Sequence, residues 1–306
     1  MNLIFMGTPD FAVPSLNAVC EAGHTVKLVI TQPDKPKGRK LLLTAPPVKE
    51  RALELGLPVE QPESMRDESI RAKIASLDAD AIIVAAYGKI LRKDILEATP
   101  LGCINVHSSL LPKYRGAAPI NWAVINGEKV SGVSTMRLDE GVDTGDILLQ
   151  AETPIDPDET AGELHDRLAQ MGAELLIKTL ELAEKGQLDP VKQDDSLSCY
   201  APMLDKSLSL IDWTKSAQQV HDLVRGIQPW PVAQTRLGGS ALKVHRTRVV
   251  EGRGECGEVI CANPLTVACG EGAVQIIELQ AEGGKRMAAA DYLRGHPVEM
   301  GTVLGK

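Results

Sequence analysis

The sequence of 306 residues lacks any apolar run that approaches a membrane span, which takes about 20 consecutive and mostly apolar residues. It begins with MNLIFMGTPD, which has neither the basic start nor the small-residue cleavage site of a secretory signal peptide. We therefore expect a cytoplasmic protein without a membrane partner. A monomer is the default expectation for its assembly.

Cysteine pairs and nucleotide-binding fingerprints are absent as well. The six cysteines contain no CxxC pair, which argues against a disulfide framework and against a zinc knuckle. We expect reduced thiols and no metal ion. Neither GxGxxG nor a GxxxxGKS or GxxxxGKT string occurs, so a nucleotide cofactor has little support.

The net charge of -8 disfavours a polyanionic partner for the chain as a whole, but the charge is uneven. Residues 200–306 hold 12 basic and 11 acidic side chains, a net of +1, whereas residues 1–199 hold 21 and 30, a net of -9. The acidic part contains one basic segment, residues 32–51, with six basic and two acidic side chains. Contacts with phosphates are therefore expected in this segment and in the C-terminal part.

Short apolar runs alternate with amphipathic segments in the first half of the chain, which is typical of βαβ units around a parallel sheet. The predicted class is α/β, with an open, mostly parallel Rossmann-like sheet and helices on both faces. We expect strands at residues 2–6, 25–31, 81–85, 103–107, 130–138 and 147–153. Helices are expected at residues 11–22, 48–55 and 161–185, and glycines mark the ends of the first two.

The second half begins after a polar segment, GQLDPVKQDDSLS at residues 186–198, that has no periodicity and is typical of a linker. One helix is expected at residues 217–225, followed by several short strands separated by glycines. Such strands are typical of a small β-barrel of the oligonucleotide-binding (OB-like) kind. The predicted domains are residues 1–185, a linker at residues 186–204, and a C-terminal β-barrel at residues 205–306.

Two strand-end loops hold the candidate chemistry. NVHSSLLPKYRGAAPINW, at residues 105–122, leaves an apolar strand, and alternation puts Asn105 and His107 on one face at the edge where open α/β sheets bind ligands. LDEGVDTGD, at residues 138–146, offers four carboxylates, one of which could hold His107 in its working tautomer. The alternatives are a turn-forming asparagine, a solvated histidine, and an acidic turn that is solvated or binds a metal casually.

Three strings resemble the formyltransferases that use 10-formyltetrahydrofolate, in order and in spacing: MGTPDFAVPSL at residues 6–16, NVHSSLLPKYRGAAPINW at 105–122 and LDEGVDTGDIL at 138–148. The resemblance implies that Asn105, His107 and Asp143 are catalytic. It also implies a binding site for 10-formyltetrahydrofolate, the formyl donor. The residues implied in this site are Ser109, Leu110, Leu111, Pro112, Tyr87, Ile90, Leu91, Leu138, Glu140 and Val142.

These residue types suit the attack of an amine on a formyl carbon, which forms a negatively charged oxygen. Asn105 and a protonated His107 can donate hydrogen bonds to that oxygen. Asp143 can orient or charge His107 and help to remove a proton from the amine. Which group moves the proton stays open.

The rest of the chain indicates the acceptor. QPDKPKGRKLLLTAPPVKE at residues 32–50 resembles an insertion of the methionyl-tRNA formyltransferases, although a solvated loop is the alternative. YAPMLDKSLSLIDW at 200–213 and RGIQPWPVAQTRL at 225–237 resemble their C-terminal domain. The resemblance implies initiator methionyl-tRNA as partner, a catalytic domain at 1–185 and a tRNA-binding domain at 205–306. The candidate tRNA contacts are Lys37, Arg39, Lys40, Lys206, Lys243, Arg246 and Arg248.

Three other functions compete with this interpretation. A glycinamide ribonucleotide formyltransferase would share the catalytic trio but has no need for the C-terminal barrel. A sugar-nucleotide formyltransferase is disfavoured by the basic loop and by the PWP segment at residues 229–231. A catalytically silent RNA-binding module is disfavoured by the intact trio.

Overall fold

The computed structural model describes residues 1–37 and 42–305. The chain divides into two compact units, neither of which is one continuous segment. The first contains Met1–Gly116, Gly132–Thr153 and His165–Tyr200, and the second contains Ala117–Ser131, Pro154–Leu164 and Ala201–Lys306. The predicted domain limits at residues 185 and 205 stay a prediction. No helix within the described residues is long and apolar enough to span a membrane.

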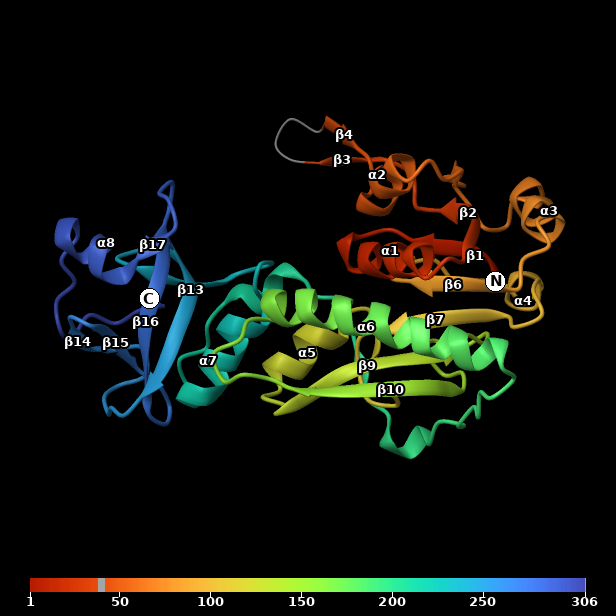
Figure 1. Ribbon diagram of the computed structural model, residues 1–306. Helices are drawn as coiled ribbons and strands as arrows, with labels where there is room; N and C mark the ends of the chain where they lie inside the picture. Colours follow the sequence, from red (N-terminus) through yellow and green to blue (C-terminus); the bar gives the residue numbers. More distant parts are fainter. Residues whose placement is uncertain (38–41, 306) are drawn as a thin grey trace. The chain divides into compact units, whose positions relative to one another are not determined.

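The first unit contains a seven-stranded sheet in the order β10-β9-β7-β6-β1-β2-β5 (Figure 1). Strand β1 pairs in parallel with β2 and β6, and β2–β5 and β6–β7 are also parallel, whereas β7 pairs antiparallel with β9. This confirms the predicted, mostly parallel sheet. The strands are β1 (Asn2–Gly7), β2 (Thr25–Ile30), β5 (Val59–Glu60), β6 (Ala81–Ala85), β7 (Cys103–His107), β9 (Val130–Arg137) and β10 (Ile147–Pro154).

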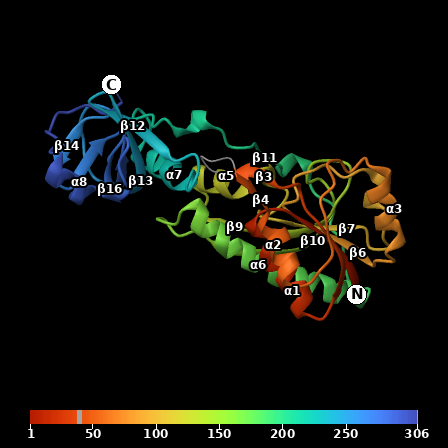
Figure 2. The same cartoon turned by 90° about the horizontal axis from the view of Figure 1, so that it is seen from above.

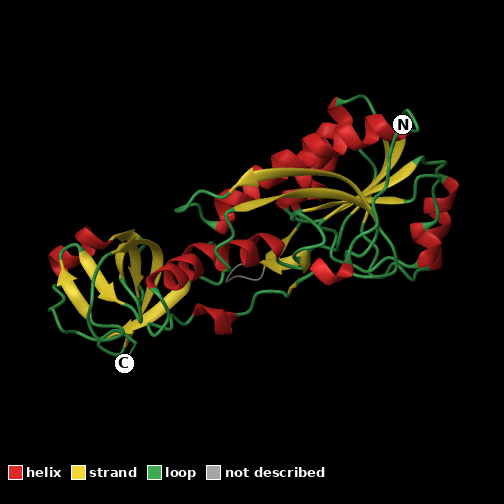
Figure 3. Cartoon of the chain, turned by 90° about the horizontal axis from the view of Figure 1, so that it is seen from below, coloured by secondary structure: helices red, strands yellow, loops and turns green. Residues whose placement is uncertain are grey.

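Helices cover both faces of this sheet, as predicted from the alternation of short apolar runs with amphipathic segments (Figure 3). On one face, the apolar cluster that includes Cys103 of β7 also contains residues of α3 (Glu68–Ser76) and α4 (Lys93–Leu96). Val106 points to the opposite face because side chains alternate along a strand. There it lies against Gly172 of α6 (Ala161–Glu184), where a β-carbon added to the glycine would come within 2.7 Å of the Val106 side chain.

The predicted helices and strands of this half are confirmed to within two residues at their ends. The helix expected at 11–22 is a 3-10 turn, η1 (Asp10–Ala12), followed by α1 (Val13–Glu21), and the next helix is α2 (Pro47–Glu54). Several short elements were not predicted. They are β3 (Lys35–Lys37), β4 (Leu42–Thr44), β8 (Arg115–Gly116), α5 (Pro119–Ile125) and η2 (Asp195–Leu197), together with β5, α3 and α4.

The second unit is built on an antiparallel sheet in the order β12-β13-β16-β15-β14, with β17 paired to β16 (Figure 2). The C-terminal region, for which a small OB-like β-barrel was predicted, thus forms a separate domain built on an antiparallel sheet. Its strands are β12 (Ala233–Leu237), β13 (Ser240–Val250), β14 (Val259–Ala262), β15 (Leu265–Ala268), β16 (Ala273–Ala281) and β17 (Met287–Ala288). The remaining elements are β11 (Tyr200–Ala201), η3 (Lys206–Ser209), α7 (Ala217–Gly226) and α8 (Ala289–Gly295).

Helix α7 begins at a capping box. The Ser216 hydroxyl accepts from the Gln219 backbone N–H at 3.2 Å, and the Gln219 side chain accepts from the Ser216 N–H at 3.1 Å. These bonds satisfy two backbone donors that the first turn of a helix leaves without partners. Val220 and Val224, one turn apart, are then buried in the apolar core of the second unit.

Candidate active site

The candidate trio begins on strand β7, whose carboxyl end carries Asn105 and His107. Both side chains are buried, with 7% and 6% of their surface exposed. They share the face of Cys103 because alternate residues of a strand point the same way. Strand alternation therefore puts the amide of Asn105 and the imidazole of His107 on one face at the end of β7, as the sequence predicts.

The His107 ring is held at both nitrogens. Its Nε2 lies 2.9 Å from the backbone carbonyl oxygen of Tyr114, which can only accept, so Nε2 carries a hydrogen and donates it. Its Nδ1 faces Asp143 Oδ2 at 3.7 Å, longer than an ordinary hydrogen bond. The structure thus brings together two of the three predicted catalytic side chains and leaves Nδ1 as the nitrogen that can exchange a proton.

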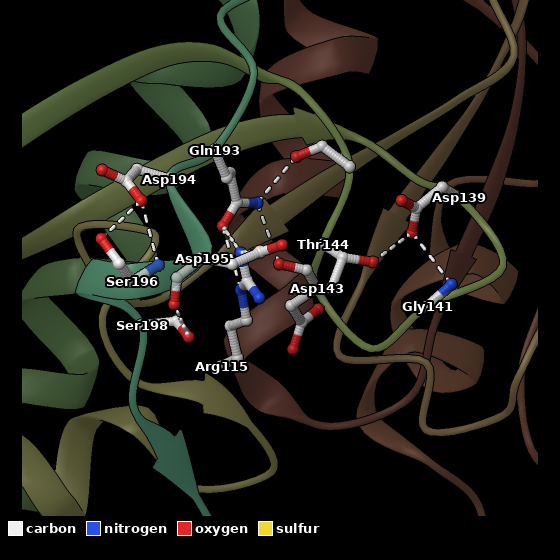
Figure 4. Close-up of polar contacts among 11 residues, drawn as sticks. Arg115, Asp139, Gly141, Asp143, Thr144, Gln193, Asp194, Asp195, Ser196 and Ser198 are labelled. Carbon is white, nitrogen blue, oxygen red and sulfur yellow. Dashed lines mark hydrogen bonds and ion pairs between the residues drawn. The ribbon is translucent and has the colours of Figure 1, made fainter.

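Asp143 lies in the loop between β9 and β10, and the loop has a strained backbone at this point. Its φ angle is +53°, in the left-handed region that costs a non-glycine residue about 1–2 kcal/mol. Asp143 Oδ2 accepts from the Gly116 N–H at 2.8 Å. Asp139 braces the same loop, because its Oδ1 accepts from the Gly141 N–H at 3.0 Å and from the Thr144 hydroxyl at 2.7 Å (Figure 4).

Gly145 explains why this loop needs its glycines. A β-carbon there would lie 1.8 Å from the carbonyl oxygen of Arg137, so the backbone could not turn back at this distance with any other residue. Among the acidic side chains of this loop, Asp143 is the one whose carboxylate faces His107.

The predicted folate loop, Ser109, Leu110, Leu111 and Pro112, is fixed by two polar side chains from the neighbouring strands. The Ser134 hydroxyl donates to the Ser109 carbonyl at 2.7 Å and accepts from the Leu111 N–H at 3.1 Å. Gln150 donates to the Leu111 carbonyl at 3.0 Å. Sequence reasoning did not identify Ser134 or Gln150, since neither stands out in a strand of mixed polarity.

The residues predicted around the pterin ring differ in exposure. Tyr87 and Leu91 are buried, and burial raises the pKa of the Tyr87 phenol to about 12. The Tyr87 hydroxyl donates to the Met65 sulfur at 3.0 Å. Ile90 is 81% exposed. Leu138 packs partly against the core, while Glu140 and Val142 are exposed; binding of folate by any of these side chains stays a prediction.

The predicted tRNA contacts divide in a similar way. Lys206, Lys243 and Arg248 are exposed, as a phosphate ligand must be. Arg246 already forms an ion pair with Glu163. Lys37 lies in β3, and the predicted contacts Arg39 and Lys40 fall outside the described residues.

Sequence reasoning missed Arg115 and Gln193, which lie directly behind the Asp143 loop (Figure 4). Arg115 lies within the string at residues 105–122 but was not singled out there, and Gln193 stands in a polar segment with no periodicity. No pattern in one sequence distinguishes a buried glutamine from its solvated neighbours. Among the described residues, no group of three or more His, Cys, Asp or Glu side chains is arranged to hold a metal ion.

Two family models match the chain. Residues 1–180 match the formyl transferase model, and residues 203–297 match the model of the formyl transferase C-terminal domain. The first match includes the His107 and Asp143 pair and the loop at residues 109–112.

Relatives of known name align over almost the whole chain. The methionyl-tRNA formyltransferase of Trichlorobacter lovleyi is 51% identical over 99% of this chain and 96% of its own length. That of Ruminiclostridium cellulolyticum is 51% identical over the full length of both chains. Among solved structures, an N-formyltransferase from Helicobacter canadensis, in complex with folinic acid and dTDP-3-aminofucose, shares the fold with a TM-score of 0.67 at 18% identity, over 93% of this chain and 99% of its own. The chain belongs to the formyl transferase family.

Proposed function

We propose that this protein transfers the formyl group of 10-formyltetrahydrofolate to the amino group of methionine on initiator methionyl-tRNA. The observation that carries the proposal is the identity of 51% to methionyl-tRNA formyltransferases, which extends through the C-terminal unit as well as the first. The N-formyltransferase in complex with dTDP-3-aminofucose shares the fold at only 18% identity. The tRNA acceptor is therefore the one that the whole chain supports.

The donor side of the reaction rests on residues of the first unit. The loop at residues 109–112, held by Ser134 and Gln150, is the proposed contact for the folate co-substrate. Its fixed backbone favours a bound geometry that needs little rearrangement, which raises the effective concentration of the formyl group at the site. No metal ion is required in this proposal.

Asn105, His107 and Asp143 are the proposed catalytic residues. The amine attacks the formyl carbon, and the carbonyl oxygen takes the negative charge. When this intermediate collapses, the bond between the formyl carbon and N10 of the folate breaks, the amine loses a proton, and the leaving nitrogen takes one up, which releases tetrahydrofolate. The Asn105 amide can donate to this oxygen, and the loss of one such donor typically slows a reaction about 100- to 1000-fold. We propose that His107 Nδ1 takes and returns a proton; its separation of 3.7 Å from Asp143 Oδ2 supports this, since a proton held there lies near a carboxylate.

The acceptor side rests on the second unit. Lys206, Lys243 and Arg248 present exposed charges that we propose contact tRNA phosphates. The region beyond residue 199 carries a net charge of +1. We therefore infer recognition by a few placed contacts rather than by strong nonspecific attraction.

The test is a formylation assay with 10-formyltetrahydrofolate and three acceptors in parallel. These are methionine-charged initiator tRNA, methionine-charged elongator tRNA and glycinamide ribonucleotide. Formylation confined to the initiator is the expected result. Transfer to glycinamide ribonucleotide alone would retain the chemistry but contradict the proposed acceptor, and transfer to none of the three would contradict the proposed function.

A further inference from the structure

Gln193 differs from its neighbours in the polar segment that follows helix α6. Within residues 186–200, all of which the structure describes, it is the one buried residue, with 7% of its surface exposed. Burial of a primary amide is unfavourable unless its hydrogen-bonding groups find partners. The polarity of the segment does not explain why this side chain is buried, so its hydrogen-bond partners must.

The amide of Gln193 is fully satisfied by groups behind the Asp143 loop (Figure 4). Its Nε2 donates to the carbonyl oxygens of Asp143 at 2.9 Å and Gly145 at 2.7 Å. Its Oε1 accepts from Arg115 Nε at 3.0 Å and Nη2 at 2.8 Å. Two donors meet two carbonyls and one acceptor meets a guanidinium, so the partners also fix which way the amide points.

The segment that carries Gln193 is itself anchored to the sheet. Val191 and Ile147, the first residue of β10, exchange two backbone hydrogen bonds at 2.8 and 2.9 Å. Arg115 also contacts the segment, since its Nη2 donates to Asp195 Oδ1 at 2.8 Å and its backbone N–H donates to the Cys199 carbonyl at 2.9 Å. Gln193 is thus supported independently of the carbonyls that it binds.

One of the two carbonyls that Gln193 holds belongs to the candidate catalytic aspartate, and the other belongs to Gly145, two residues later. Asp143 has a φ of +53°, and such a conformation persists only where the surroundings determine it. The two N–H groups of the Gln193 amide bind the carbonyls of Asp143 and Gly145, on either side of Thr144, and so fix this turn. In front, the Asp143 carboxylate faces His107 Nδ1 at 3.7 Å.

We infer that Gln193 is a positioning residue for formyl transfer, which acts by holding the Asp143 backbone so that the carboxylate stays directed at His107. The inference rests on the proposed function for its kinetic test and on geometry alone for its spectroscopic one. Gln193 contacts no reacting atom. Its effect is therefore expected in turnover rather than in the binding of either substrate.

The first test is Gln193→Glu, which keeps the shape and the acceptor for Arg115 but replaces both donors with an oxygen that repels the two carbonyls. Gln187→Glu is the matched control, because Gln187 is exposed in the same segment and receives the same charge. We expect kcat to fall about tenfold or more for Gln193→Glu, with KM for both substrates nearly unchanged. Wild-type kcat in a folded Gln193→Glu protein would overturn the inference.

A double-mutant cycle with Asp143→Asn separates positioning from a structural role. If Gln193 acts through Asp143, Gln193→Glu should cause little further loss of kcat in the Asp143→Asn background. Losses that multiply would overturn the inference. Should Gln193→Glu fold poorly, Gln193→Asn, which withdraws the amide by one methylene, serves in the same cycle.

A measurement without substrate keeps this inference apart from the proposed function. In histidine-labelled protein, the His107 ring resonances, assigned with His107→Ala, should move in Gln193→Glu and stay in place in Gln187→Glu. Unmoved resonances would overturn the inference even if the wild-type enzyme is active. A wild type that formylates no acceptor would contradict the proposed function, and the resonances would then decide the inference alone.

Discussion

At the scale of single residues, the candidate site depends on one histidine whose two nitrogens have different tasks. Nε2 donates to the Tyr114 carbonyl, so Nδ1 is the nitrogen that faces Asp143. The backbone hydrogen bond fixes the ring plane as well as the tautomer. Under the proposed function, a substitution at His107 would remove a proton acceptor that the structure already orients.

We expect His107→Ala to lower kcat for formylation about 100- to 10,000-fold, the range typical of a lost general acid or base. Binding of methionyl-tRNA should persist, because the ring lies in the first unit, below its surface. Single-turnover formylation and a filter-binding assay measure the two effects. His296→Ala, at an exposed histidine, is the control; near-normal turnover of His107→Ala would remove this residue from the mechanism.

The placement of Asn105 and His107 on one strand face follows from the period of a strand and could be predicted from the residues alone. Asp143 could not be singled out in this way, since its loop holds four carboxylates and only a resemblance distinguishes one. Gln193 could not be found at all. Its burial depends on Arg115, which precedes it by 78 positions, and on the carbonyls of Asp143 and Gly145.

At the scale of elements, predictability follows length and periodicity. The central strands are short apolar runs that end in polar loops, and α6 repeats its apolar positions over 24 residues, so both were predicted. The hairpin of β3 and β4 and the four-residue α4 were not. Such short elements have too few residues to show a period, and packing against other parts of the chain stabilises them.

The capping box of α7 provides a test at this scale. We expect Ser216→Ala to lower the free energy of unfolding by about 1 kcal/mol, because the Gln219 N–H loses its acceptor and the reciprocal pair of capping bonds is broken. Denaturant unfolding of the full chain measures this. Ser240→Ala, at an exposed position of β13, should change it much less. Equal effects of the two variants would mean that the cap contributes nothing specific.

At the scale of the whole molecule, charge is distributed so that the acidic excess lies before residue 200. Attraction of a polyanion over the entire surface is therefore weak, and the exposed cations of β13 matter individually. Arg246 is already paired with Glu163, which leaves Lys243 and Arg248 as the better candidates on that strand.

Reversal of these two charges, Lys243→Glu with Arg248→Glu, should raise KM for methionyl-tRNA and reduce its dependence on salt. The slope of log KM against log salt should fall by about 0.7–0.9 for each phosphate that the protein no longer neutralises. KM for the folate co-substrate should not change. Lys285→Glu with Arg253→Glu reverses two other exposed charges and is the control; an equal rise in KM for tRNA in both pairs would contradict specific contacts.

The interleaved composition of the two units has a consequence for any attempt to separate them. The second unit includes Ala117–Ser131 and Pro154–Leu164, which lie before residue 200. Helix α5 in the first of these segments packs against α7, and the Asn121 amide donates to the Gly226 carbonyl. A fragment that stops at residue 200 keeps α5 but loses α7. Ile125 of α5, which lies beside Gly226 of α7 and packs against the apolar core of the second unit, would then lose these neighbours. Limited proteolysis or domain transplantation should therefore yield incomplete units that expose apolar side chains and tend to aggregate. The two units should be engineered together, as one chain.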